Sequence, residues 1–204
     1  MLRIGVDFDN TIVCYDRVFH RAAVEQGLIP PETAADKNSV RDYLRAQGGE
    51  EHWIALQGEV YGKRMLEADP FPGFLAFAKA AQAAGAALLI VSHKTRIPFK
   101  GPAWDLHQAA RDWIAAHLGN AMVPPENVFF ELTKDAKLGR IAQCGCTHFI
   151  DDLPEILTAP AFPAGTRGLL FDPAGHFAGD SRYVRMHGWP VLSHHFAFAG
   201  AQPA

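Results

Sequence analysis

The sequence has few cysteines, no long apolar run and no surplus of positive charge. Three cysteines are too few, and odd in number, for a disulfide framework, which favours a reducing compartment. We expect small buried thiols, because the Cys144-Gly145-Cys146 run lacks the second pair that a zinc site needs. No uninterrupted apolar stretch reaches the roughly 20 residues of a membrane-spanning helix.

The net charge argues against a nucleic-acid-binding protein, and the N-terminal residues argue against a signal peptide. The net charge of -3 offers no basic surplus to a nucleic acid. Asp7 and Asp9 interrupt the first apolar stretch too early for a signal peptide. We therefore expect a cytoplasmic protein with no nucleic-acid or membrane partner. Whether it is a monomer or a homodimer stays open at this point.

Alternating strands and helices are the main feature that is present. Short apolar, β-rich runs predict buried strands over residues 2–8, 86–92, 127–132, 147–152 and 167–173. Helical patterns separate most of them, which predicts an α/β fold: a mostly parallel sheet with helices on both faces, in three layers. The tail from Ala174 onward, rich in His, Gly and aromatic residues, has no predicted place.

A block of helical patterns interrupts this alternation directly after the first strand. Stretches at 15–28, 38–48 and 50–68 read as helices separated by Pro and Gly. We predict a core domain of residues 1–14 and 67–204 and a small helical cap of residues 15–66 that serves as a lid. Its candidate substrate contacts, for each of which a solvated helix face is the favoured interpretation, are Tyr15, Asp16, His20, Lys63 and Arg64.

Polar side chains gather where the predicted strands end. Ser92 ends the second strand and Asp151 and Asp152 end the fourth; the other groups are Asp7, Asp9, Thr11, Thr133, Lys134 and Lys137. The carboxyl ends of parallel strands meet at one edge, so these groups are expected to lie together. Each alone has an ordinary explanation in turns, caps or solvated faces. Together they suggest a Mg²⁺ site, because the ion prefers oxygen ligands and lysine offsets the remaining charge.

The order of these groups resembles the haloacid dehalogenase (HAD) superfamily. The run DFDNT, residues 7–11, resembles motif I, DxDx[TV]. LLIVS, ending at Ser92, resembles motif II, a lysine at a helix start resembles motif III, and HFIDDL, residues 148–153, resembles motif IV. The resemblance spans residues 4–157. It implies a HAD-like Rossmannoid core with a small C1-type helical cap.

The resemblance also implies roles for individual residues. Asp7 would be the nucleophile that forms an aspartyl-phosphate, and Asp9 the general acid that protonates the leaving group and then activates water. The implied phosphate-binding groups are Ser92, His93, Phe8 and Asp9, and the implied Mg²⁺-binding groups are Asp7, Asp9, Asp152 and Asp151. Asp9 would contribute its backbone carbonyl, and Asp151 stands where related proteins carry Gly.

Two lysines compete for the role of the motif III lysine. Lys134 is slightly favoured, because it takes the first helical position after the predicted cap, Thr133. Lys137, nearly one turn further along the same helix, remains the alternative.

These expectations converge on a magnesium-dependent phosphatase for a small-molecule phosphate monoester, either a sugar or polyol phosphate or a nucleoside monophosphate. The second carboxylate, Asp9, favours phosphate chemistry, because a halide leaving group needs no proton. A phosphomutase and a non-catalytic HAD-like binding module remain alternatives.

The basic loop after Ser92 either reads a second anionic group or is solvated: His93, Lys94, Arg96 and Lys100. Asp105 is expected to cap the next helix or, with His107, to anchor that loop.

Overall fold

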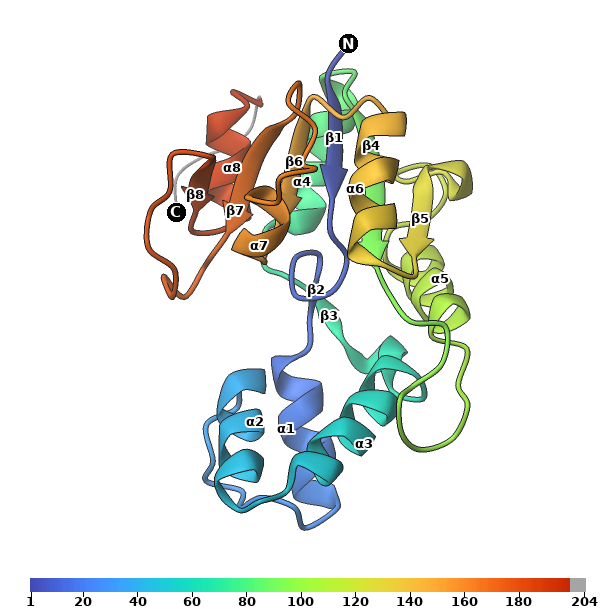
Figure 1. The fold of residues 1–204 in the computed structure, drawn as a ribbon. Helices are drawn as coiled ribbons and strands as arrows, with labels where there is room; N and C mark the ends of the chain where they lie inside the picture. Colours follow the sequence, from blue (N-terminus) through green and yellow to red (C-terminus); the bar gives the residue numbers. More distant parts are fainter. Residues whose placement is uncertain (199–204) are drawn as a thin grey trace. The chain divides into compact units, whose positions relative to one another are not determined.

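The structure, a computed structural model, describes residues 1–198, and they form two compact units (Figure 1). The first, called the sheet unit here, comprises Met1–Val13, Pro70–Lys94 and the chain from Leu118 onward. The second, called the helical unit, comprises Cys14–Asp69 and Thr95–His117. The predicted cap segment lies within the helical unit, which also takes in the loop and helix that follow Lys94. The last six residues of the C-terminal tail lie outside the described chain.

A six-stranded parallel sheet forms the centre of the sheet unit. Its order is β5-β4-β1-β6-β7-β8, and every neighbouring pair is parallel. The predicted α/β fold is thus confirmed. The strands are β1 (Arg3–Val6), β4 (Ala87–His93), β5 (Val128–Glu131), β6 (His148–Asp151), β7 (Arg167–Phe171) and β8 (Tyr183–Met186).

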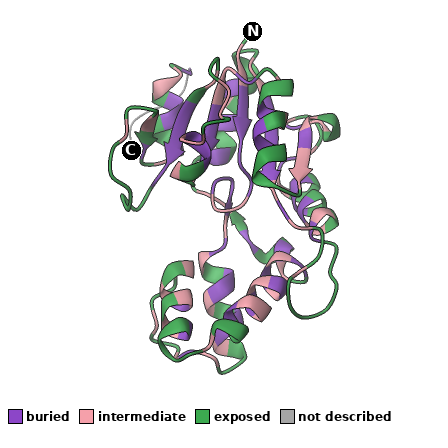
Figure 2. Ribbon diagram, viewed as in Figure 1, coloured by how far each residue is buried: buried purple, intermediate pink, exposed green. Residues whose placement is uncertain are grey.

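Helices cover both faces of this sheet. In Figure 1, α6 (Lys134–Gln143) and α7 (Pro154–Leu157) lie in front of it, and α4 (Phe74–Ala83) and α8 (Trp189–His195) lie behind it. A short 3-10 helix, η2 (Pro125–Asn127), precedes β5. Figure 2 shows the sheet strands as largely buried between these layers. Leu138, Ile141, Phe149 and Leu170 belong to the apolar cluster beneath α6 and α7.

The central strand β1 carries the chain to the carboxyl edge of the sheet. Ile4 and Val6 are completely buried, and the Asp7 N–H donates to the Ile150 carbonyl at 2.8 Å, which prolongs the pairing with β6. A tight turn follows, with Asn10 at a φ of 59°, a left-handed conformation that Asn tolerates better than most residues. The chain then enters β2 (Val13–Cys14), which pairs with β3 (Asp69–Pro70) in a separate two-stranded sheet.

The helical unit packs its helices around aromatic side chains. Its helices are α1 (Asp16–Glu25), α2 (Lys37–Ala46), α3 (Glu50–Tyr61), η1 (Met65–Glu67) and α5 (Leu106–His117). The Phe19 ring lies 4.9 Å from that of Trp53, between centroids, and the buried Trp113 indole donates to the Ala68 carbonyl. The helix predicted over 50–68 is interrupted at Gly62, where a Cβ would lie 2.6 Å from the Cβ of Trp104.

Two further features differ from the sequence expectation or extend it. The unplaced tail supplies a sixth strand, β8, and the helix α8, whose Trp189 is completely buried. The three cysteines are free thiols; Cys146 is buried, as predicted, whereas Cys14 and Cys144 are only partly buried. Within residues 1–198, no helix combines the length and apolar character that a bilayer crossing requires.

The packing around Gly5 in β1 generates a prediction about stability. A Cβ at Gly5 would lie 2.6 Å from the Phe149 ring and 2.8 Å from the Cys146 sulfur, so Gly5→Ala must displace packed core atoms. We expect the substitution to lower the free energy of unfolding by about 1–3 kcal/mol, measured by urea denaturation.

Gly139→Ala is the matched control for this substitution. Gly139 lies exposed within α6, and a Cβ added there would point into open space, with no atom of another element within 4 Å. Alanine is favoured over glycine in a helix by about 1 kcal/mol, so this variant should be as stable as the wild type or more so. Equal effects at both positions would contradict the packing argument.

Candidate active site

Four elements of the sheet unit deliver polar side chains to one point at the carboxyl edge of the sheet. The Ser92 hydroxyl, at the end of β4, donates to Oδ1 of Asp7 at 2.9 Å. The Lys137 ammonium, from α6, donates to the same Oδ1 at 2.6 Å and to Oδ2 of Asp151, at the end of β6, also at 2.6 Å. All four side chains are buried. Such a cluster is compatible with folding only because its charges are paired.

The structure reverses the order in which the two candidate lysines were ranked. Lys137 is 1% exposed and bridges Asp7 and Asp151, whereas Lys134 pairs with Glu155 at an exposed position. The physical reason is helix periodicity: Thr133 caps α6 as predicted, accepting the Ala136 N–H at 3.1 Å, and the side chain nearly a turn further in points to the core.

Burial and neighbouring charges perturb the two central groups in this cluster. Burial raises the pKa of Asp7 from 3.8 to about 7, the Lys137 ammonium opposes the rise, and the Asp151 carboxylate adds to it. Burial lowers the pKa of Lys137, but the charges of Asp151 and Asp7 outweigh burial and leave it above its ordinary value. Asp7 therefore has a strongly perturbed pKa, as is common for groups at functional sites.

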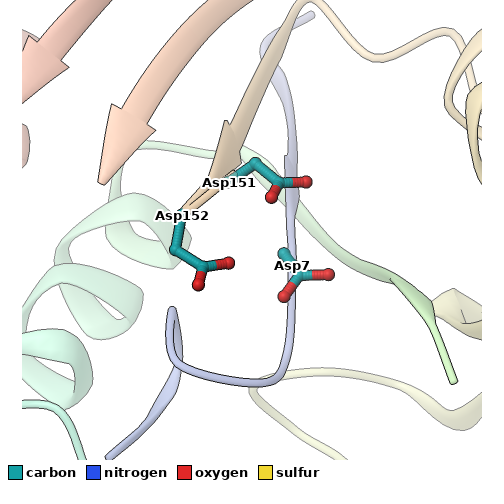
Figure 3. Close-up of side chains that lie close together, drawn as sticks. All are labelled: Asp7, Asp151 and Asp152. Atoms are coloured by element: carbon teal, nitrogen blue, oxygen red, sulfur yellow. The ribbon is translucent and has the colours of Figure 1, made fainter. Parts of the chain in front are cut away.

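Three carboxylates at this point form an oxygen-rich group suited to a hard divalent cation. Asp7, Asp151 and Asp152 each offer an oxygen, and these oxygens lie within 4.8 Å of one another (Figure 3). Asp151 already accepts from Lys137 through one oxygen and from the Leu153 N–H through the other. Asp7 and Asp152 are thus the better placed to bind a cation, and their all-oxygen chemistry fits Mg²⁺.

Asp9 is held by a residue that sequence reasoning placed only in the basic loop. The Lys94 ammonium donates to both carboxylate oxygens of Asp9, at 2.9 and 2.8 Å. Lys94 is 4% exposed. A signal for this was present, because alternate residues of a strand share a face and Lys94 follows Ser92 by two positions.

Phe8 and His93 are the remaining predicted phosphate-binding residues. Phe8 is completely buried, and its carbonyl accepts the N–H groups of Ile12 and Val13. The His93 ring contacts the Leu132 carbonyl at 3.2 Å rather than a carboxylate. Among residues 1–198, the buried hydroxyl of Thr11 has no hydrogen-bond partner.

The predicted substrate contacts of the cap segment, and most of the basic loop, belong to the helical unit. Tyr15 is buried there, and Lys63 is exposed. Others make local polar contacts: Asp16 with the Lys37 N–H, Arg64 with Glu25 and Glu59, Arg96 with Asp105, and Lys100 with Glu51. His20 Nε2 is buried without a partner among the described residues. Asp105 accepts the Gln108 N–H, as a residue at a helix start would.

Comparison with known proteins gives matches in structure only. No family model and no curated protein matches the sequence. Solved structures do match. One is a HAD family hydrolase from Deinococcus radiodurans with bound phosphate and sodium, 18% identical over 99% of this chain and 98% of its own, with a TM-score of 0.54. Another is a HAD-superfamily hydrolase from Ehrlichia chaffeensis, 13% identical over 96% and 95%, with a TM-score of 0.54.

A third match is an L-2-haloacid dehalogenase, 12% identical over 97% of this chain and 99% of its own, with a TM-score of 0.61. These alignments span nearly the full length of both proteins in each case. At such low identities the likeness describes the fold, and the chemistry has to be argued from the site itself.

The raised pKa of Asp7 predicts how stability depends on pH. Between pH 3.8 and about 7 the unfolded chain loses the Asp7 proton while the folded chain keeps it, so this group lowers stability as the pH rises. Relative to Asp7→Asn, the wild type should lose up to about 4 kcal/mol between pH 4 and pH 8, at 1.36 kcal/mol per pKa unit. Urea denaturation of both proteins in EDTA measures this difference.

A difference between the two proteins that stays constant with pH would contradict the assignment. Asp112→Asn, which removes an exposed carboxylate of the helical unit, is the control for the loss of one carboxylate as such.

Proposed function

Because the chain has the fold of the HAD-superfamily hydrolases, we propose that it is a magnesium-dependent phosphatase acting on a small-molecule phosphate monoester. The observation that carries the proposal is the arrangement around Asp7. This carboxylate is buried beside a lysine, a hydroxyl and two further carboxylates at the carboxyl edge of a parallel sheet. Ligands of such sheets bind at that edge.

In the proposed first half of the reaction, Asp7 attacks phosphorus. Its Oδ1 is fixed by Ser92 and Lys137, and its Oδ2 accepts no hydrogen bond from the described residues, so we assign Oδ2 as the attacking atom. The new bond joins Asp7 to phosphorus, and the bond from phosphorus to the ester oxygen breaks. That oxygen keeps the electron pair and takes a proton from Asp9, and an aspartyl-phosphate remains.

In the second half, a water molecule attacks the same phosphorus and gives a proton to Asp9. The bond to Asp7 breaks, and Asp7 leaves as a carboxylate that Lys137 again neutralises. Ser92 and Lys137 donate toward the phosphoryl oxygens, where charge has to be offset. A carboxylate nucleophile divides one difficult displacement into two easier ones.

The acidic group of the site fits a Mg²⁺ ion, as its geometry indicates. We propose that Asp7 and Asp152 bind it through their side chains and Asp9 through its backbone carbonyl. When bound there, the ion supplies positive charge to the phosphoryl group and relieves the repulsion between the carboxylates. This is consistent with the raised pKa of Asp7 in the metal-free protein.

Asp9 is the residue that separates phosphate chemistry from dehalogenation. One of the structures with this fold is a haloacid dehalogenase, so the fold alone leaves both reactions open. A halide departs without a proton, whereas the alkoxide of a phosphate ester needs one. Asp9 is partly exposed beside the Asp7 site, which supports the proposal that it gives this proton.

The substrate class follows from the same reasoning. We propose a sugar phosphate, a polyol phosphate or a nucleoside monophosphate, with the segment 15–66 of the helical unit serving as the cap. The protein is expected to work in the cytoplasm, without a nucleic-acid or membrane partner. A phosphomutase with the same residues is the alternative.

Phosphate release from a panel of metabolite phosphates tests the proposal. Wild-type protein with Mg²⁺ should release phosphate selectively from one class of ester, and EDTA should abolish the release. Asp7→Asn should lower kcat by at least about 10³-fold, because the nucleophile is lost. Since Asp7→Asn keeps the size of the side chain, its thermal unfolding reports separately on folding.

Other results would favour other reactions. Isomerised sugar phosphate without free phosphate would indicate a mutase, and halide release from L-2-chloropropionate would indicate a dehalogenase. Folded protein that is inactive in all three assays would leave the binding-module alternative.

A second prediction compares the two lysines of α6. Lys137→Met removes the cation that bridges Asp7 and Asp151, so we expect kcat/KM to fall by about 10²–10³-fold, the range for losing one charge-stabilising donor. Lys134→Met, an exposed substitution at the start of the same helix, should stay within about threefold of the wild type. Steady-state kinetics of both variants would measure the contrast, and a larger loss in Lys134→Met would reverse the assignment.

A further inference from the structure

Each carboxylate of the acidic turn after β1 has its own buried lysine. Asp7 is paired with Lys137, and Asp9 is paired with Lys94. Each ammonium also lies over an aromatic ring, Lys137 5.5 Å from the centroid of Phe149 and Lys94 5.7 Å from that of Phe8. The first pair belongs to the reaction centre already described. The second has no role in that chemistry so far.

The position of Lys94 is fixed by the sheet rather than by a mobile loop. It follows the last residue of β4 directly, and its N–H donates to the Glu131 carbonyl at 2.9 Å, which continues the pairing of β4 with β5. The ammonium reaches Asp9 from this anchored backbone. A buried lysine is rare unless it is paired, so this placement calls for an explanation.

The exposed fractions show which partner faces the solvent. The Lys94 side chain is 3% exposed, whereas that of Asp9 is 19% exposed. The lysine therefore lies behind the carboxylate, and an incoming molecule reaches Asp9 first. This geometry argues against Lys94 as a direct reader of a second anionic group, one of the two roles considered for the basic loop.

We propose that Lys94 is a positioning residue that acts through Asp9. Two hydrogen bonds from one ammonium restrict the rotation of the carboxylate, which one bond would not do. The proton exchanged with the leaving group or the water belongs to Asp9.

The inference rests on the proposed function and predicts a specific signature. Proton donation by Asp9 matters most when the leaving oxygen is strongly basic. Phenyl phosphate and p-nitrophenyl phosphate have nearly the same shape, but phenolate is the more basic leaving group. If Lys94 acts through Asp9, its loss must reproduce the pattern of leaving-group dependence that the loss of Asp9 produces.

The experiment is a double-mutant cycle with Lys94→Met, Asp9→Asn and the double variant, assayed on both esters with Mg²⁺. We expect Lys94→Met to lower kcat/KM for phenyl phosphate at least about tenfold more than for p-nitrophenyl phosphate, within the range of general acid catalysis. Asp9→Asn should show the same bias. In the Asp9→Asn background, Lys94→Met should change kcat/KM by less than about threefold, because residues that act as a unit are not additive.

Controls separate this role from a general effect on folding. Lys79→Met removes an exposed lysine from α4 and should leave both rates unchanged. Lys94→Arg retains a cation with several donors and should restore part of the phenyl phosphate activity. If Lys94→Met does not fold, the double variant, which removes both buried charges together, still reports on the pair in comparison with Asp9→Asn.

Equal losses on both esters, or a full further loss in the Asp9→Asn background, would overturn the positioning role while the phosphatase assignment stands. Wild-type protein that hydrolyses neither these esters nor any metabolite phosphate would overturn the proposed function, and this inference with it.

Discussion

The bridge that Lys137 makes between Asp7 and Asp151 is the interaction on which the rest of the site depends. It joins the end of β1, the end of β6 and the first turns of α6 through two bonds of 2.6 Å. Two carboxylates buried this close would repel each other strongly without the ammonium between them. Removing one partner of a buried ion pair leaves an uncompensated charge, so the three elements are held together by the same contact that holds the proposed nucleophile.

This arrangement concentrates negative charge at the site. Lys137 neutralises one negative charge, but Asp7, Asp151 and Asp152 bring three to the same few ångströms. Burial is the main reason why the pKa of Asp7 stays raised despite a lysine in contact with it, and the charges of Asp151 and Asp9 add to the rise. Any group that brings positive charge stabilises the ionised form of such a carboxylate. Natural proteins commonly accept lower stability at a site of this kind in return for function.

The fold and the chemistry rest on different evidence. The solved structures that match include two HAD-family hydrolases and a dehalogenase that are 12 to 18% identical to this chain. They support the fold as a whole, and a fold of this kind supports several reactions. The proposed choice among reactions rests on two side chains of this chain, Asp7 and Asp9, and on the lysine that each one contacts.

The sequence by itself determined the strands, the alternation with helices and the residues at the strand ends, because these depend on local apolar patterns and on the rule that parallel strands present their carboxyl ends together. Only the tertiary structure decided between Lys134 and Lys137, since helix phase relative to the sheet selects the inward side chain. It also placed Lys94 behind Asp9 and showed that residues 183–186 of the tail form β8, which pairs with β7. Pairing between buried charges is a property of positions in space, and a linear pattern of residue types does not specify it.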